Sequence, residues 1–366
     1  MQGARMDTVK ANAIQLFRQM KPSDIFSVVT FSDWAEVLIP ATRVADLDRV
    51  ENRINQITTS GGTEIYHGLE AALSQVRKYS SPSYINHMIL LTDGRTYGDE
   101  PQCLHLAEVA SNEGVGLSGL GIGHEWNDIF LDRLVSFSGG SSMYVSAPRE
   151  LKNFLEEKFS NLEKVYAKGV SLTFDLPENV ELRFAFRIQP EAGMLTTDSP
   201  IRVGNLIQSK NLTLVLEFLV QNISGHSPEQ ILAKGNIIMD IPTRTVPMVR
   251  IPMTLKRPVT EVTEPEAPHP LLVEALSRLT LYRMQDRARS EVAAGDIPKA
   301  TKHLQYLATH LLAQGERELA HTVLVEAEHI QHTAGFSKEG DKRIKYGTRA
   351  LLLPPGPEIK KYDPLP

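Results

Sequence analysis

The sequence predicts a three-part chain whose first part is an open, doubly wound α/β sheet. Its first 165 residues alternate short apolar runs with segments in which apolar residues recur at helical spacing. The clearest run is Ile25 to Phe31 (IFSVVTF), and a second, Met88 to Leu91, leads directly into Thr92-Asp93-Gly94. Continuous apolar runs suit strands that are covered on both faces, as in a parallel sheet. We therefore predict a doubly wound α/β domain over residues 1–165.

Each element of this domain follows from the same periodicity. Short apolar runs predict strands at residues 25–31, 37–39, 88–91, 115–122 and 143–145. Apolar residues at helical spacing predict helices near residues 6–20, 47–57, 65–76, 104–110, 129–137 and 151–165. Gly119, Gly121 and Gly123 do not have the spacing of a dinucleotide-binding loop, so we expect them to allow a close approach at the end of a strand.

The pattern changes over residues 166–257, where one strand follows another. Alternation with a period of two is clear over residues 182–188, and turn residues such as those at 177–179 and 224–226 separate the apolar runs. The strands that we expect here lie at residues 170–174, 182–188, 212–220, 231–241 and 246–255. This segment therefore predicts an antiparallel β-sandwich-like domain.

The third part of the chain is predicted to be helical. Residues 258–270 (PVTEVTEPEAPHP) are rich in proline and glutamate, which is typical of an extended linker. Long amphipathic patterns follow at residues 271–294, 298–313 and 316–334, with short connections between them. Short connections make neighbouring helices antiparallel, so we predict a helical bundle over residues 271–350. Residues 351–366 are predicted to form an irregular tail.

Composition narrows the classes of function. The 366 residues carry a net charge of −5, so no global basic field favours nucleic acid or anionic lipid as a partner. The single cysteine, Cys103, excludes an internal disulfide framework and a zinc-binding thiolate cluster. The apolar runs are far shorter than a membrane span, and the first residues lack the pattern of a secretory signal. We therefore expect a cytoplasmic protein without a membrane span.

Two polar side chains are predicted to lie at one edge of the sheet. Asp93 directly follows the strand at 88–91, and Thr63 lies in a glycine-rich loop, Ser60 to Thr63, that opens a helix. In an open α/β sheet, ligands bind at the carboxyl ends of the strands. A carboxylate and a hydroxyl suit a hard cation such as Mg²⁺. The alternative is purely structural, because Asp-Gly is a common turn and Thr before Glu is a common N-cap.

These residues carry a resemblance to a known family. The series Gly61-Gly62-Thr63, Leu90 to Gly94 (LLTDG), Gly119 to Gly123 (GLGIG) and Gly139-Gly140 resembles the von Willebrand factor type A domain of bacterial proteins in order and spacing. The resemblance implies a metal-ion-dependent adhesion site, built from an Asp-x-Ser-x-Ser motif, a threonine and an aspartate. Thr63 and Asp93 would be the last two ligands. The cation would be Mg²⁺, Mn²⁺ or Ca²⁺, and a protein partner would offer it an acidic group.

The chain departs from the family in its first residues. No Asp-x-Ser-x-Ser motif precedes the first predicted helix, and Met1-Gln2-Gly3 matches the end of the Ser-Met-x-Gly sequence that often follows that motif. Our hypothesis is that Met1 is a misassigned start or a fragment edge. The family's first strand lies at the centre of the sheet, so without it the strands at 25–31 and 88–91 would keep unpaired edges unless they pair with each other. We therefore expect poor stability and weak or absent cation binding.

The function that we expect is protein binding without catalysis. No Ser/His/Asp or Cys/His arrangement has a supporting motif, so the sequence predicts no enzyme active site. An alternative is an accessory subunit of an AAA+ or chelatase-type ATPase machine, because such machines contain domains of this family. A hydrolase active site in the β domain is a third alternative, although no acid–base constellation supports it. We interpret the basic run Lys342 to Arg349 as a solvated helix face.

Overall fold

The computed structural model describes residues 3–43, 47–58, 61–81, 83–223, 228–260 and 267–352. The turn expected at 224–226, much of the expected linker and the tail from residue 353 lie outside these residues. The chain divides into two units, described separately below. The first comprises Met1–Arg187 and Gly193–Pro265, and the second comprises Ile188–Ala192 and Glu266–Pro366.

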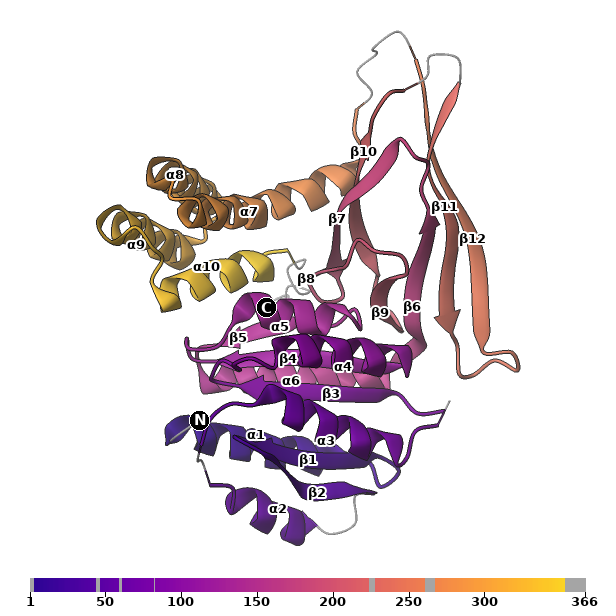
Figure 1. Cartoon of the computed structure of the whole chain (residues 1–366), viewed down its shortest axis with the longest axis vertical. Helices are drawn as coiled ribbons and strands as arrows, with labels where there is room; N and C mark the ends of the chain where they lie inside the picture. The colour runs from indigo at the N-terminus through magenta and orange to yellow at the C-terminus, as the bar shows by residue number, and fades with distance from the viewer. Residues whose placement is uncertain are drawn as a thin grey trace, which may run out of the picture. The chain divides into compact units, whose positions relative to one another are not determined.

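The first unit begins with a doubly wound α/β domain, as predicted (Figure 1). Its strands are β1 (Ile25–Phe31), β2 (Ala35–Arg43), β3 (Asn86–Thr92), β4 (Val115–Ile122) and β5 (Ser142–Val145). Its helices are α1 (Ala4–Gln19), α2 (Leu47–Asn55), α3 (Ile65–Arg77), α4 (Glu100–Asn112), α5 (Asp128–Ser136) and α6 (Pro148–Glu163). Every element therefore falls where the apolar periodicity placed one, with most ends displaced by a few residues.

Strands β3, β4 and β5 form a parallel sheet with β4 in the centre. Nearly every residue of β4 is buried, as a central strand with helices on both faces requires. Its glycines allow the close packing that the sequence predicted. A Cβ atom at Gly119 would lie 2.6 Å from Leu131, and one at Gly121 would overlap the indole of Trp126.

Strands β1 and β2 form a separate antiparallel pair, in which Val29 lies opposite Val37. The prediction that Ile25–Phe31 belongs to a parallel sheet is therefore wrong, although a helix covers each face of the strand, α1 on one side and α3 on the other. All seven residues of β1 are only half-buried. Neither edge-to-edge pairing of β1 with β3 nor a strand between them occurs in the described part of the chain. An apolar run predicts that a strand forms but not which strands pair with it, and the prediction failed for this reason.

The two sheets nevertheless belong to one layer. On one face, α1 packs Phe17 against β1 and β2, and packs Leu16 into the cluster that contains Ile89 of β3 and Leu120 of β4. On the other face, α3 contacts β1, β2 and β3. The same two helices therefore hold both sheets, and β1 and β3 are the facing edges of a layer that is interrupted between them (Figure 1).

The second part of this unit is a two-sheet β domain, as predicted. Its strands are β6 (Val165–Asp175), β7 (Val180–Gln189), β8 (Gly193–Met194), β9 (Ile201–Ile207), β10 (Thr213–Val220), β11 (Glu229–Asp240) and β12 (Met248–Pro258). One sheet has the order β10-β7-β8 and the other β12-β11-β6-β9. Side chains of both sheets share one core, which makes the arrangement a sandwich. Strands β8 and β9 were not predicted from the sequence.

A buried arginine joins the β domain to the α/β domain within this unit. Arg187 of β7 is 3% exposed. Its guanidinium donates hydrogen bonds to the carbonyl oxygens of Gly139, Gly140 and Val203, the last over 2.7 Å. A buried cation needs such partners, because an unpaired buried charge is very costly. The glycine pair that leads into β5 is thus held by a strand of the β domain.

The second unit is helical, as predicted, and contains α7 (Pro270–Ala293), α8 (Ile297–Ala313), α9 (Arg317–Thr333) and α10 (Lys338–Ala350). The four helices share one apolar core. The short connections predicted between the first three helices are confirmed, and they contain Gly295 and Gly315, whose φ values are positive at 79° and 85°. No helix in the described ranges has both the length and the apolar character that a membrane crossing requires.

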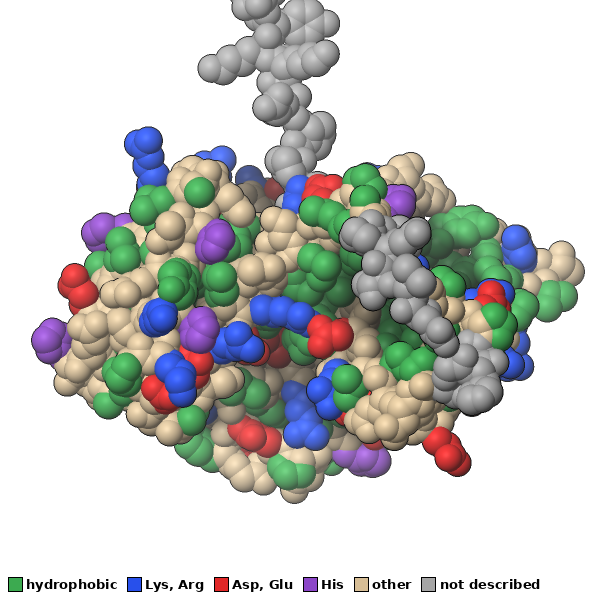
Figure 2. Space-filling model, turned by 90° about the horizontal axis from the view of Figure 1, so that it is seen from above, with side chains coloured by type: hydrophobic (Ala, Val, Ile, Leu, Met, Phe, Trp, Pro, Cys, Tyr) green, Lys and Arg blue, Asp and Glu red, His purple; other side chains and the backbone are tan. Residues whose placement is uncertain are grey.

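The basic run near the end of the second unit is not a solvated face, contrary to our interpretation. Lys342, Lys345 and Arg349 of α10 are each less than 5% exposed. The guanidinium of Arg349 lies 4.9 Å from the ring centre of Tyr346 and 5.5 Å from that of Tyr282. Stacking on aromatic rings stabilises a partly desolvated arginine, which a count of charges cannot reveal. On the molecular face in Figure 2, basic and acidic side chains are interspersed.

Candidate functional site

Asp93 lies in a tight turn at the carboxyl end of β3. The hydroxyl of Thr92, the last residue of β3, donates a hydrogen bond of 3.0 Å to the carbonyl oxygen of Gly94. Thr92 is buried, so this bond fixes the turn against the core of the domain. Asp93 itself is half-buried at the rim of the sheet. Asp93 can therefore be both a turn residue and a cation ligand, because the turn presents it at the end of the strand.

Thr63 lies in the loop that leads into α3, and this loop is held by the β1–β2 hairpin. The backbone N–H of Gly62 donates to a carboxylate oxygen of Asp33 over 2.7 Å, and the N–H of Glu64 donates to the carbonyl oxygen of Ser32 over 2.7 Å. A side chain at Gly61, whose φ is +78°, would collide with the Asp33 carboxylate. The loop therefore fits closely around that carboxylate, and glycine is required there.

The loop and the turn meet at Thr63 and Gly94. A Cβ atom at Gly94 would lie 2.6 Å from the hydroxyl oxygen of Thr63, so the hydroxyl lies directly against the backbone that carries Asp93. The structure thus places Thr63 against Gly94, the residue that follows Asp93. Asp33 joins them through its hydrogen bond to Gly62. Three loops converge at one edge of the α/β domain: the loop after β1, the loop before α3 and the loop after β3. We call this edge, around Asp33, Thr63 and Asp93, the loop edge.

Asp33 was not among the site residues predicted from the sequence. A signal for it was present, because Ser32-Asp33 follows the apolar run Ile25 to Phe31 just as Asp93 follows the run at 88–91. The reasoning that polar residues at carboxyl ends of neighbouring strands meet at one edge would have included it. It was overlooked because the antiparallel partner of β1 follows so closely that Asp33 reads as an ordinary hairpin residue.

The structural alternative for Thr63, an N-cap, does not hold. The N-cap of α3 is Glu64, and no side chain of the N-cap residue closes the helix. The loop after β3 does so instead: Thr96 accepts a hydrogen bond from the N–H of Ile65 over 3.2 Å, and Asp99 accepts one from the N–H of Tyr66 over 2.9 Å. The Thr96 hydroxyl in turn donates to the Asp99 carboxylate. The Thr63 hydroxyl is therefore not used as a helix cap.

The cysteine nearby supplies neither a ligand nor a nucleophile. Cys103 of α4 is fully buried. Burial, and then the neighbouring Asp99 carboxylate, raise the pKa of its thiol far above neutral pH. The thiol therefore stays protonated, whereas metal binding and nucleophilic attack both need the thiolate.

The donors at the loop edge are oxygen atoms, which suits a hard divalent cation. They are few, however. Within the described ranges, no group of three or more histidine, cysteine, aspartate and glutamate side chains is placed to hold a metal ion. Thr63 and Asp93 therefore fit a cation as a partial set of ligands that would leave most coordination positions to water or to a partner.

Comparison with known proteins agrees with this organisation. Residues 1–168 match the family model of the von Willebrand factor type A domain, and residues 270–354 match that of the Sll0103-like, C-terminal alpha-helical domain. An uncharacterized protein of Synechocystis, sll0103, is 25% identical over 97% of this chain and 86% of its own length. Inter-alpha-trypsin inhibitor heavy chain H1 of Sus scrofa is 27% identical over 48% of this chain and 20% of its own length.

Two solved structures share the fold over nearly the whole chain. A von Willebrand factor type A protein from Catenulispora acidiphila has a TM-score of 0.73 at 16% identity and is matched over 94% of this chain and 84% of its own. The ArnB paralog VWA2 from Sulfolobus acidocaldarius has a TM-score of 0.56 at 15% identity, over 95% and 83%. The family models agree with the fold of each part, and the chain therefore contains a von Willebrand factor type A domain at residues 1–168 and a Sll0103-like helical domain at residues 270–354.

Proposed function

We propose that this chain is a non-enzymatic binding protein whose contact surface is the loop edge around Asp33, Thr63 and Asp93. The convergence of the three loops carries the proposal. Asp33 fixes the loop of Thr63 through Gly62, and Thr63 lies against the turn of Asp93. Loops positioned by a rigid sheet are where proteins of open α/β architecture bind ligands. Domains of this family are generally interaction modules.

A divalent cation is proposed to assist binding at this edge. The Thr63 hydroxyl and the Asp93 carboxylate would be its protein ligands, and the cation would attract an acidic group of the partner. Asp33 is the less suitable ligand, because one of its carboxylate oxygens already accepts the hydrogen bond from Gly62. With so few protein ligands, we expect a dissociation constant for Mg²⁺ of about 1 mM or weaker.

The remainder of the chain is proposed to act as a scaffold. We place the domain boundaries near residues 165 and 270, with the β domain and the helical bundle as further contact surfaces. An AAA+ ATPase as partner, and a cytoplasmic location, remain predictions. Co-purification of a hexameric ATPase with the full chain, dependent on Asp93, would support that partner.

Cation titration tests the ligands directly. We would titrate Mn²⁺ and Mg²⁺ into the wild-type chain and into Thr63→Val, Asp93→Asn and the control Asp48→Asn, which removes an exposed carboxylate on α2. The expected result is millimolar binding by the wild type and the control, and a loss of at least about tenfold in the other two variants. Equal binding by all four proteins would contradict the ligand assignment, and micromolar binding would contradict the partial site.

A further inference from the structure

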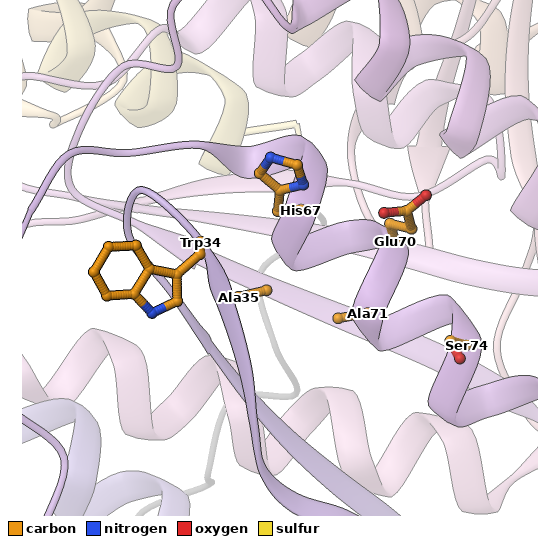
Figure 3. Close-up of a pocket in the computed structure, with 6 residues that line it drawn as sticks. All are labelled: Trp34, Ala35, His67, Glu70, Ala71 and Ser74. Atoms are coloured by element: carbon orange, nitrogen blue, oxygen red, sulfur yellow. The ribbon is translucent and has the colours of Figure 1, made fainter.

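A groove lies beside the loop edge, between the β1–β2 hairpin and α3 (Figure 3). It has a volume of about 450 Å³ and is lined by Trp34, Ala35, His67, Glu70, Ala71 and Ser74, and we call it the Trp34 groove. Its small residues come from β2 and from one face of α3, while Trp34 projects from the hairpin tip and His67 and Glu70 rise from the helix. The chain thus forms a trough with an aromatic side and an acidic side.

Trp34 is held out from the protein by a rigid backbone. Trp34 is 66% exposed, whereas the other tryptophan, Trp126, is 0% exposed. The hairpin that carries it is fixed, because the N–H of Ser32 donates to the Trp34 carbonyl oxygen over 2.9 Å and Phe31 pairs with Ala35. Rigidly placed, exposed tryptophan is a frequent anchor of protein interfaces.

The charge of the groove is negative. The hydroxyl of Tyr66 donates a hydrogen bond of 3.0 Å to Glu70, which orients that carboxylate and raises the pKa of Tyr66. Glu64 lies 3.4 Å from the imidazole of His67. In the part of the chain that the structure describes, neither Glu64 nor Glu70 forms an ion pair with lysine or arginine, and the same is true of Asp33 and Glu36, which flank Trp34 and Ala35.

An aromatic side chain and carboxylates that no lysine or arginine neutralises in the described residues favour one kind of partner segment. A guanidinium can stack on an indole ring and can donate to a carboxylate, so a segment that carries arginine suits both sides of the groove, whereas an acidic or a purely apolar segment suits at most one. The groove is also continuous with the loop edge, since Trp34 follows Asp33 and His67 lies four residues after Thr63. A partner that covers the loop edge would therefore reach it.

We propose that the Trp34 groove binds an arginine-bearing segment of the protein partner, whose basic and apolar groups meet Glu70 on one side and Trp34 on the other. The inference rests on the proposed interaction function, but not on its cation. The partner would then carry two groups that this chain recognises. The groove would bind its arginine, and the loop edge would bind its acidic group. The partner is thus a protein surface that places an arginine beside an acidic side chain.

The test uses a displayed library of random peptides, selected on the full wild-type chain in EDTA so that no cation contributes. The strongest binder is synthesised with a fluorophore, and its affinity is measured by fluorescence anisotropy for the wild type, Trp34→Ala, Glu70→Gln and the control Glu108→Gln, an exposed carboxylate on α4. We expect arginine in the selected peptides, a loss of about tenfold for each groove variant and no change for the control. Quenching of the exposed Trp34 by the bound peptide provides an independent signal.

Selection of peptides without arginine, or equal binding by the wild type and both groove variants, would overturn the proposal. Peptides from a parallel selection in Mg²⁺ separate it from the proposed function. Binding that is lost in Thr63→Val and Asp93→Asn, depends on Mg²⁺ and is unaffected at Trp34 and Glu70 would refute the groove and support the loop edge. Binding that is lost only in the groove variants, with or without Mg²⁺, would support the groove while leaving the cation site to its own titration.

Discussion

Asp99 is predicted to stabilise the start of α3 more than an ordinary surface carboxylate stabilises a helix. Its carboxylate accepts from the N–H of Tyr66 over 2.9 Å and from the hydroxyl of Thr96, which is buried and accepts from the N–H of Ile65. Asp99→Ala removes a helix cap, which costs about 0.5–2 kcal/mol. It also leaves the buried Thr96 hydroxyl without its acceptor, which costs about 1 kcal/mol. We therefore expect a loss of about 2 kcal/mol in the free energy of unfolding.

Urea denaturation followed by the fluorescence of the buried Trp126 measures this loss. Asp99→Asn is the matched control, because it keeps an acceptor oxygen and removes only the charge, so it should lose about half as much. An Asp99→Ala protein within about 0.5 kcal/mol of the wild type, which is the range of ordinary surface substitutions, would refute the argument that the loop after β3 closes α3.

Three further predictions concern packing and charge. Leu73→Ala removes a side chain that is 0% exposed and should cost about 2–5 kcal/mol in thermal or chemical denaturation. Gly121→Ala places a methyl group into the indole of Trp126 and should cost about 1–3 kcal/mol, seen also as a shifted tryptophan emission. Arg77, through its hydrogen bond, lowers the pKa of Glu113. This stabilisation is present above the unfolded pKa of about 4.3 and is lost as the pH falls through the lowered pKa. Because both side chains are partly exposed, Arg77→Ala should lower the stability only slightly at pH 7 and not at all in acid, and a larger loss at low pH would contradict the assignment.

Local elements were predictable from the sequence because apolar periodicity reports burial. Ile25–Phe31 and Val115–Ile122 are strands over the residues expected, and the helix expected at 65–76 is α3. The short β8 and the strand β9 were missed, since Gly193–Met194 is too short to show a period and Ile201–Ile207 (IRVGNLI) contains polar and glycine residues. The helix α10 was not predicted as a separate element, because lysine and arginine residues share its buried face with Ile344 and Tyr346 and obscure the apolar period.

Pairings and contacts between distant segments were less predictable. The sequence placed Thr63 and Asp93 at one edge through the rule for open sheets, and the structure brings Thr63 against Gly94. It did not reveal Asp33, whose role depends on the distant N–H of Gly62, or the caps that Thr96 and Asp99 provide to α3. Each of these bonds joins residues about 30 positions apart, and local periodicity carries no information on such contacts.

The interruption between β1 and β3 gives the loop edge a mechanical role. The two strand systems are joined by α1 and α3 and, at the rim, by the bond from Glu64 to Ser32 and the contact of Thr63 with Gly94. The loop edge therefore connects β1 and β3 across this interruption, and a ligand that contacts the loops on both sides would add a further connection between the two sheets. Binding energy then adds to folding energy: a ligand at ten times its dissociation constant stabilises the folded form by about 1.4 kcal/mol. Partner binding would accordingly increase the stability of the folded domain, and a change that destabilises the domain would weaken partner binding.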